Sequence, residues 1–169
     1  MAEQVESTYH LINAENKYKP AKAYVTKPID VSSLDHQYAR ADIEFYDVDH
    51  SEASYTAHLF FNNPKANDKT ARNAKNGYAG CFHVFGHGGC YGDAGHCDVP
   101  PVRRLYDPRP AHPLTKATKV VIATNAVRQA VGTGGLVTLT VVPLVTAATN
   151  LCNIDEVFSC SAIRFVAYR

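Results

Sequence analysis

The chain has 169 residues, 46% of them hydrophobic, and a net charge of +1. This length fits a single domain, residues 1–169, that can bury a sufficient hydrophobic core without disulfides or structural metals. The almost neutral charge gives no electrostatic reason to expect nucleic acid or an anionic membrane as a partner. No run of about 18 apolar residues is present, so we expect no membrane span.

The number of cysteines and the N-terminal residues indicate in which cellular compartment the protein is expected. Five cysteines cannot all be paired with one another. Residues 1–6 are acidic and polar, without the basic start and apolar stretch of a secretory signal. We therefore expect a cytoplasmic protein whose thiols are reduced or metal-bound. A secreted protein whose signal has been removed is the alternative.

The first half of the chain predicts strands separated by a polar connection. Residues 1–36 contain scattered Lys, Pro and Tyr and are expected to wrap the domain as short edge strands and loops. Residues 42–48 alternate polar and apolar, which predicts a half-buried strand. Residues 54–61 predict a second strand, and the polar connection 62–77 ends in an Asn-Gly turn. That turn leads into a third predicted strand at 78–85.

After this strand, residues 86–98 are rich in glycine and residues 100–113 form a proline-rich connector. Residues 118–123 predict a strand. Residues 124–131 predict two helical turns, capped by Thr124 or Asn125 and stopped by Gly132.

Two strands complete the chain, at 136–145, which is rich in Val and Thr, and at 158–168. Many strands with one short helix predict an all-β fold, either an antiparallel β-sandwich or a jelly-roll-like barrel.

One segment concentrates side chains that bind transition metals. The eighteen positions from Cys81 to Asp98 hold three His, three Cys and two Asp. Imidazole and thiolate are the ligands that copper and zinc prefer, and iron is a further option. The intervening glycines let the backbone fold sharply, so that ligands distant along the loop can converge. The candidate metal ligands are His83, His87, Cys90, His96 and Cys97.

Two metal geometries are compatible with this segment. In the first, His87, Cys90, His96 and Cys97 close a four-ligand structural site. The adjacent pair His96 and Cys97 fits less well, because neighbours in an extended chain point to opposite faces.

In the second geometry, His83, His87 and His96 form a three-imidazole site with an open position, as in a catalytic metal centre. In a regular strand His83 and His87 would lie roughly 13 Å apart, so the chain must bend at Gly86. In the alternative without a metal, Cys90 and Cys97 form a disulfide and the histidines only form hydrogen bonds.

Candidate catalytic residues flank these ligands. Asp93 or Asp98 could serve as a further ligand, orient a ligand or act as a general base. Tyr91, with Tyr78, could line an aromatic pocket. Outside the segment, His58 is expected to be a satisfied strand histidine, and Cys160 either pairs with Cys152 or stays a free thiol.

The order of segments resembles the C-terminal domain of the tyrosinase and polyphenol oxidase family, over residues 40–145. The corresponding pieces are 55–63, 78–82, 87–89, 118–131 and 137–143. The resemblance implies a β-sandwich that, in full-length members, packs over a dicopper centre and shields it. The helical dicopper domain with its six histidines is not found in these 169 residues, so the resemblance carries over no oxidase activity.

Three functions follow as hypotheses. The first is a small metalloenzyme that acts on a small molecule, for instance a phenol, by oxidation or by lyase or hydrolytic chemistry. The second is a non-enzymatic shielding, metal-delivery or assembly module for a partner oxidase. The third is a zinc knot or disulfide loop with a purely structural role. Association with a second copy of the chain is left open.

Overall fold

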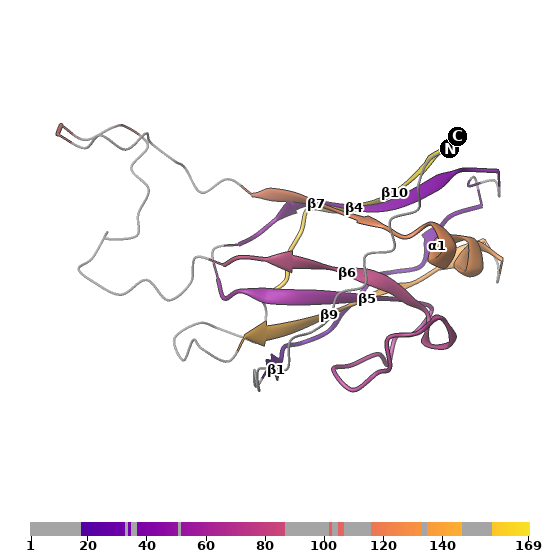
Figure 1. Cartoon of the computed structure of the whole chain (residues 1–169), viewed down its shortest axis with the longest axis horizontal. Helices are drawn as coiled ribbons and strands as arrows, with labels where there is room; N and C mark the ends of the chain where they lie inside the picture. The colour runs from indigo at the N-terminus through magenta and orange to yellow at the C-terminus, as the bar shows by residue number, and fades with distance from the viewer. Residues whose placement is uncertain are drawn as a thin grey trace, which may run out of the picture.

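The computed structural model describes residues 18–32, 34, 37–50, 52–86, 102, 105–106, 116–132, 135–146 and 157–169. Its larger sheet has the strand order β1-β9-β5-β6, and β2 also pairs with β9. All these pairings are antiparallel, and Figure 1 shows β6, β5, β9 and β1 side by side in one layer. The strands are β1 (Tyr18–Pro20), β2 (Tyr24–Val25), β5 (Tyr55–Phe61), β6 (Tyr78–Val84) and β9 (Leu139–Thr146).

A three-stranded antiparallel sheet with the order β10-β4-β7 forms the second layer. A two-stranded ribbon joins β3 to β8. The described part of the chain contains no closed barrel, so the β-sandwich of the two predicted architectures is the one observed. These strands are β3 (Ile29–Asp30), β4 (Arg40–Val48), β7 (Ala117–Ile122), β8 (Leu136–Val137) and β10 (Ala162–Tyr168).

The hydrophobic core lies between the two layers. Phe45 of β4 contacts Phe82 of β6, with ring centroids 4.8 Å apart. Phe61 of β5 contacts Phe165 of β10 at 5.6 Å. Both pairs join the sheets, because alternate residues of each strand point inward. The strands predicted at 42–48, 54–61 and 78–85 are therefore confirmed as β4, β5 and β6. The alternation predicted at 42–48 is seen in Ile43 and Phe45, which are buried, and Glu44 and Tyr46, which are less so.

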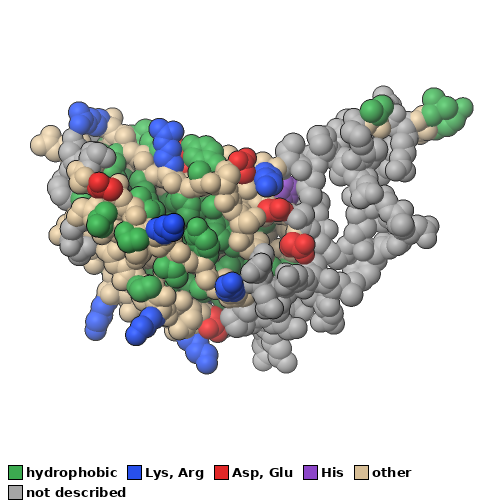
Figure 2. All heavy atoms as spheres, turned by 180° about the vertical axis from the view of Figure 1, so that it is seen from behind, with side chains coloured by type: hydrophobic (Ala, Val, Ile, Leu, Met, Phe, Trp, Pro, Cys, Tyr) green, Lys and Arg blue, Asp and Glu red, His purple; other side chains and the backbone are tan. Residues whose placement is uncertain are grey.

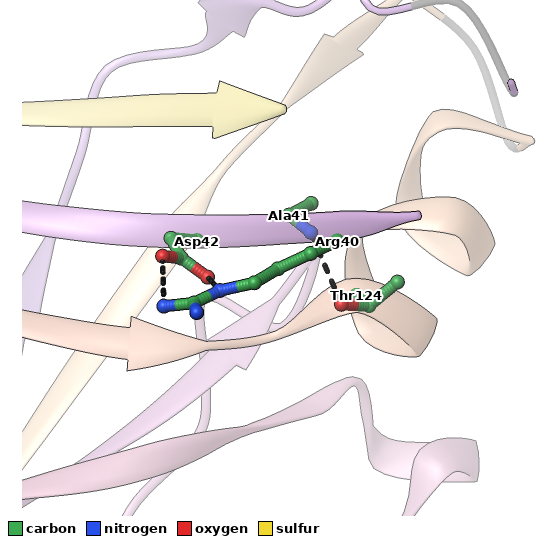
Figure 3. A network of polar contacts seen from close by, with 4 residues as sticks. All are labelled: Arg40, Ala41, Asp42 and Thr124. Carbon is green, nitrogen blue, oxygen red and sulfur yellow. Dashed lines mark hydrogen bonds and ion pairs between the residues drawn. The ribbon is translucent and has the colours of Figure 1, made fainter. Parts of the chain in front are cut away.

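The predicted helix is present as α1 (Thr124–Val131) and ends at Gly132. Its predicted cap is wrong, because Ala123 occupies the N-cap and no side chain caps the helix. Thr124 instead accepts a hydrogen bond from the Ala41 backbone N–H at 3.0 Å, which ties the helix to the start of β4 (Figure 3). A tertiary contact has replaced the local one.

Two further strand predictions are corrected. The strand predicted at 136–145 is divided at Thr138 into β8 and β9. Thr138 exchanges two hydrogen bonds with Asn62, its N–H to Asn62 Oδ1 and its carbonyl from the Asn62 N–H. The strand predicted at 158–168 begins only at Ala162 as β10.

The back of the molecule, opposite to the view of Figure 1, gathers hydrophobic side chains in its middle with charged side chains around them (Figure 2). Of the exposed hydrophobic residues, Val120 and Ile122 lie on β7 and Tyr168 on β10. Alternation places them on the face of the three-stranded sheet that points away from the core.

Within the described residues, no helix has both the length and the apolar character that crossing a bilayer requires.

Candidate functional site

Of the predicted metal ligands, His83 is the one that lies in the described part of the chain. It lies near the end of β6, paired across the sheet with Thr56 of β5, and its side chain is exposed on the outer face of the larger sheet. His83 Nδ1 and Thr56 Oγ1 are hydrogen-bonded at 2.9 Å. This bond orients the imidazole and leaves Nε2 without a hydrogen bond to any described residue. The ring is therefore prepared to use Nε2 as a ligand.

Further donors share this outer face. Cys81 is two residues before His83 on β6, and the register pairs it with His58 of β5. Tyr78 is brought to the same face by a register shift between Leu59 and Phe60. The Cys81 thiol is free.

His58 is buried under this face, as expected for a satisfied strand histidine. It is 6% exposed, and its Nδ1 lies 3.3 Å from the Tyr78 hydroxyl. Burial lowers the pKa of His58 to about 4, and the charges of Arg72 and His83 add to this shift. Burial also raises the pKa of Tyr78, with Cys81 as the next cause. At neutral pH His58 and Tyr78 are therefore both uncharged.

The chain is clamped where the His/Cys/Gly segment leaves β6. The Gly86 N–H donates to Ser54 Oγ at 3.0 Å. A Cβ on Gly86 would lie 2.0 Å from the Glu52 carbonyl oxygen and 2.4 Å from the Ala53 carbonyl carbon. The backbones of residue 86 and of the β4–β5 connection are thus in direct contact. This contact fixes the root of the His/Cys/Gly segment, the point at which the segment leaves the sheet. Glycine is therefore sterically required at position 86. The bend that the sequence predicts there would involve residue 87, which lies outside the described residues, and it stays a prediction.

We expect Gly86→Ala to lower the free energy of unfolding by about 2 kcal/mol, because the clash is with backbone that cannot rotate away. Urea denaturation measures this change. Gly132→Ala is the matched control, since its Cβ would meet the Arg128 carbonyl oxygen at an ordinary 3.4 Å. Equal stability of the two variants would contradict the clamp.

The other candidate residues lie outside the described part of the chain, and their predicted roles stay predictions. They are His87, Cys90, Tyr91, Asp93, His96, Cys97 and Asp98. Among the residues that are described, no group of three or more His, Cys, Asp or Glu side chains lies close enough together to hold a metal ion. A metal at His83 would therefore need donors from elsewhere in the chain.

A second group of titratable side chains lies near the β4–β5 connection. The Tyr55 hydroxyl is buried and forms no hydrogen bond with any residue that the structure describes. Burial raises its pKa, with Cys160 and Asp49 as the next causes. Cys160 is a free thiol, and burial raises its pKa as well. Burial thus favours the protonated Cys160 thiol, which is a weaker nucleophile than the thiolate.

Reasoning from the sequence did not find the joint face of His58, Tyr78, Cys81 and His83. Residues 81 and 83 are separated by two positions, a spacing that places them on one face of a strand. Their juxtaposition with Thr56 and His58 depends on the register between β5 and β6, which no local pattern specifies.

No family model and no curated protein matches this chain. Among solved structures, the chain is similar to "Latent aurone synthase (polyphenol oxidase) from natural source", with 15% identity and a TM-score of 0.45. The alignment covers 88% of this chain and 25% of that protein, so the chain spans about a quarter of its length. The matched protein is described as a polyphenol oxidase, and a likeness of this size assigns no function to the present chain.

Proposed function

We propose that this chain is a metal-binding β-sandwich that holds one transition-metal ion, copper or zinc. His83 is the ligand on the sheet. The remaining ligands come from His87, Cys90, His96 and Cys97, which follow it in the sequence. Imidazole and thiolate donors suit both metals.

The geometry of His83 carries this proposal. Histidines that bind metals usually engage their second ring nitrogen in a hydrogen bond that sets the ring's orientation. The contact of Nδ1 with Thr56 Oγ1 is of this kind, and it leaves Nε2 for the metal. The strand that presents the ring leads to Gly86, whose backbone is in close contact with residues 52–54. Cys81 and His58 lie on neighbouring positions of β6 and β5, but they do not form a metal-binding group with His83, so the further ligands must come from the segment after β6.

With an open coordination position, the bound ion would act as a Lewis acid or lower the pKa of a bound water. Asp93 and Asp98 are the groups that would orient a ligand or move a proton. Tyr91 would form part of the pocket wall for a small-molecule substrate.

Elemental mass spectrometry of protein purified without a tag tests the proposal. We expect one copper or zinc ion per chain in the native sequence and its loss in His83→Ala. His50→Ala is the control, since His50 lies in the β4–β5 connection and not on the outer face of β5 and β6. A folded protein that contains no metal and binds none on titration would refute the proposal.

Thr56→Val is expected to weaken metal binding by about 10- to 100-fold, because the ring of His83 loses the hydrogen bond that orients it. Competition with a chromophoric chelator measures the affinity. Thr118→Val on β7 is the control, as an exposed strand threonine in the other sheet. If both variants bind metal equally well, Thr56 does not position the ligand.

A second candidate function is that of a docking module for another protein, such as an oxidase. The observation that favours it is the exposed hydrophobic surface of the three-stranded sheet. Val120 is 48% exposed, Ile122 62% and Tyr168 43%. Exposed apolar residues that share one face are typical of interaction surfaces.

Co-purification from the native source tests the docking function. We expect a stoichiometric partner to remain bound to the native sequence and to be lost from Ile122→Glu. Leu136→Glu is the control, because Leu136 is similarly exposed but lies on β8. A monodisperse monomer without any bound protein would contradict docking.

A further inference from the structure

A cavity lies at the end of the sandwich opposite to the root of the His/Cys/Gly segment. Its volume is about 250 Å³. Residues 61–63 at the end of β5, residues 74–77 before β6 and one face of α1 line it. Figure 1 shows α1 and the β5–β6 connection at the same end of the molecule. The cavity is therefore separate from the proposed metal site.

The walls of the cavity are held in place by backbone contacts. Gly77 has φ +76°, and a Cβ there would lie 2.1 Å from the Phe61 carbonyl oxygen. The Phe61 N–H donates to the Gly77 carbonyl at 2.7 Å. Thr140 of β9 holds the neighbouring part of the wall, because its Oγ1 donates to the Asn63 carbonyl at 2.9 Å. The cavity is thus formed before any ligand arrives, which reduces the ordering cost of binding.

Three amide side chains in the lining have their nitrogen atoms engaged. Asn63 Nδ2 donates to the Asn76 carbonyl at 3.0 Å, and Asn76 Nδ2 donates to the Ala71 carbonyl at 2.9 Å. Gln129 Nε2 donates to the Ala74 carbonyl at 3.4 Å. The three amide oxygens accept no hydrogen bond from a described residue. They are acceptors, so a ligand must supply O–H or N–H donors.

The charge around the cavity is positive. Lys75 belongs to the lining, is exposed and forms no ion pair with a described residue. No carboxylate lines the cavity. The connection that contributes Lys75 also carries Lys65, Lys69 and Arg72 against a single acid, Asp68. This surplus of positive charge favours an anionic group on the ligand.

The size and apolar part of the lining restrict the ligand further. At about 250 Å³ the cavity lies just below the roughly 300–1,000 Å³ of most small-molecule sites, which favours a ligand about as large as one sugar ring. The Phe61 ring is buried against Phe165, and the apolar wall of the lining comes from Ala126 and Ala130, four residues apart on one face of α1. Such a wall suits the C–H face of a ring.

We propose that this cavity binds a small polyhydroxylated carboxylate, of the size and chemistry of a hexuronate. The hydroxyl groups donate to the amide oxygens of Asn63, Asn76 and Gln129. The carboxylate pairs with the ammonium group of Lys75. This is a binding site and involves no covalent step.

Titration with glucuronate, followed by amide NMR shifts of the full chain, tests this site. We expect saturable shifts confined to residues 61–63, 74–77 and 126–130, with millimolar affinity. Glucose has the same ring without the carboxylate, and we expect it to bind about fivefold more weakly. Lys75→Gln should reduce glucuronate to the affinity of glucose. Lys69→Gln, a change of the same charge in the same connection but outside the cavity lining, should leave the affinity unchanged.

Two further variants examine the volume and the acceptors. Ala126→Leu fills the cavity and should abolish binding. If the larger side chain prevents folding, Gln129→Ala is used in its place. This variant removes one hydrogen-bond acceptor from the exposed surface of α1 and should weaken binding. The site is refuted if glucuronate gives no saturable shifts, if glucose binds as tightly, or if Lys69→Gln weakens binding as much as Lys75→Gln. His83→Ala should bind glucuronate normally, so that failure of the metal proposal and failure of this one are separate results.

Discussion

Arg40→Met is expected to lower the free energy of unfolding by about 3 kcal/mol, because it leaves a buried carboxylate without its partner. Asp42 is 1% exposed, although it points to the outer face of the three-stranded sheet. The register places Val166 of β10 and Ile122 of β7 on either side of it. Arg40 Nε and Nη2 donate to its two oxygens at 2.7 and 2.6 Å (Figure 3).

The two side chains of this ion pair differ in exposure, so we expect the two single substitutions to lower stability by different amounts. The Arg40 side chain is 49% exposed, so water can solvate the guanidinium when its partner is removed. Asp42→Val should therefore cost less than about 1 kcal/mol. The double variant Arg40→Met with Asp42→Val should approach native stability, since replacing both partners leaves no unpaired charge.

Urea denaturation of the four proteins forms a double-mutant cycle that measures this effect. Equal losses of unfolding free energy in the two single variants would show that the unpaired Asp42 carboxylate is no more unfavourable than the unpaired Arg40 guanidinium. A loss below about 0.5 kcal/mol for Arg40→Met would show that water reaches Asp42 once the arginine is gone.

Most of the fold was predictable because its signals are local. The helix at 124–131 has apolar residues at helical spacing and is followed by glycine, and the structure begins and ends it at those residues. The strand at 42–48 shows the period-two pattern that a face packed on the core requires, and turn signals adjoin the strands at 54–61 and 78–85. Burial alternates from Ile43 to Tyr46 in β4, whereas every residue of β5 except Thr56 is buried.

The failures occurred where a distant partner determined the outcome. Nothing in the run from residue 136 to 145 marks Thr138 as a break, since the break comes from its two hydrogen bonds with Asn62. Thr124 has the chemistry of a helix cap, but its hydroxyl is used by the Ala41 N–H from another strand. Both interactions depend on tertiary contacts that override local preference.

The candidate site was predictable in composition and not in geometry. The density of His, Cys and Gly after residue 80 is visible in the sequence and includes His83. The orienting contact with Thr56 is not visible, because 27 positions and a register shift separate the two residues. The cavity beside α1 is likewise built from three segments that only the fold brings together.

Acidification from neutral pH to about pH 4 should destabilise the protein through His58 by about 3 kcal/mol. In the folded protein burial lowers the pKa of His58 to about 4, against a value of 6.5 for the free side chain. Between these two values the unfolded state binds a proton that the folded state does not. Stability from neutral His58 is thus fully present above about pH 6.5 and is lost as the pH falls toward 4.

The surroundings of His58 explain why protonation is unfavourable. The ring is buried, its Nδ1 is close to the Tyr78 hydroxyl, and the other titratable groups of the described chain that face it are Cys81, His83 and the cationic Arg72. None of these groups is a carboxylate that could compensate a positive charge on the ring. His58→Phe removes the titration and keeps an aromatic ring beside Phe60 and Tyr78.

Comparison of the unfolding free energies of the native protein and His58→Phe across this pH range isolates the effect, because all other groups titrate in both proteins. The native curve should be steeper by up to about 1.4 kcal/mol per pH unit between pH 4 and 6.5, and the two curves should run parallel above it. Parallel curves throughout would show that His58 accepts a proton as readily in the folded as in the unfolded chain. The face of β5 and β6 that carries His83 would then be open to water as far down as His58.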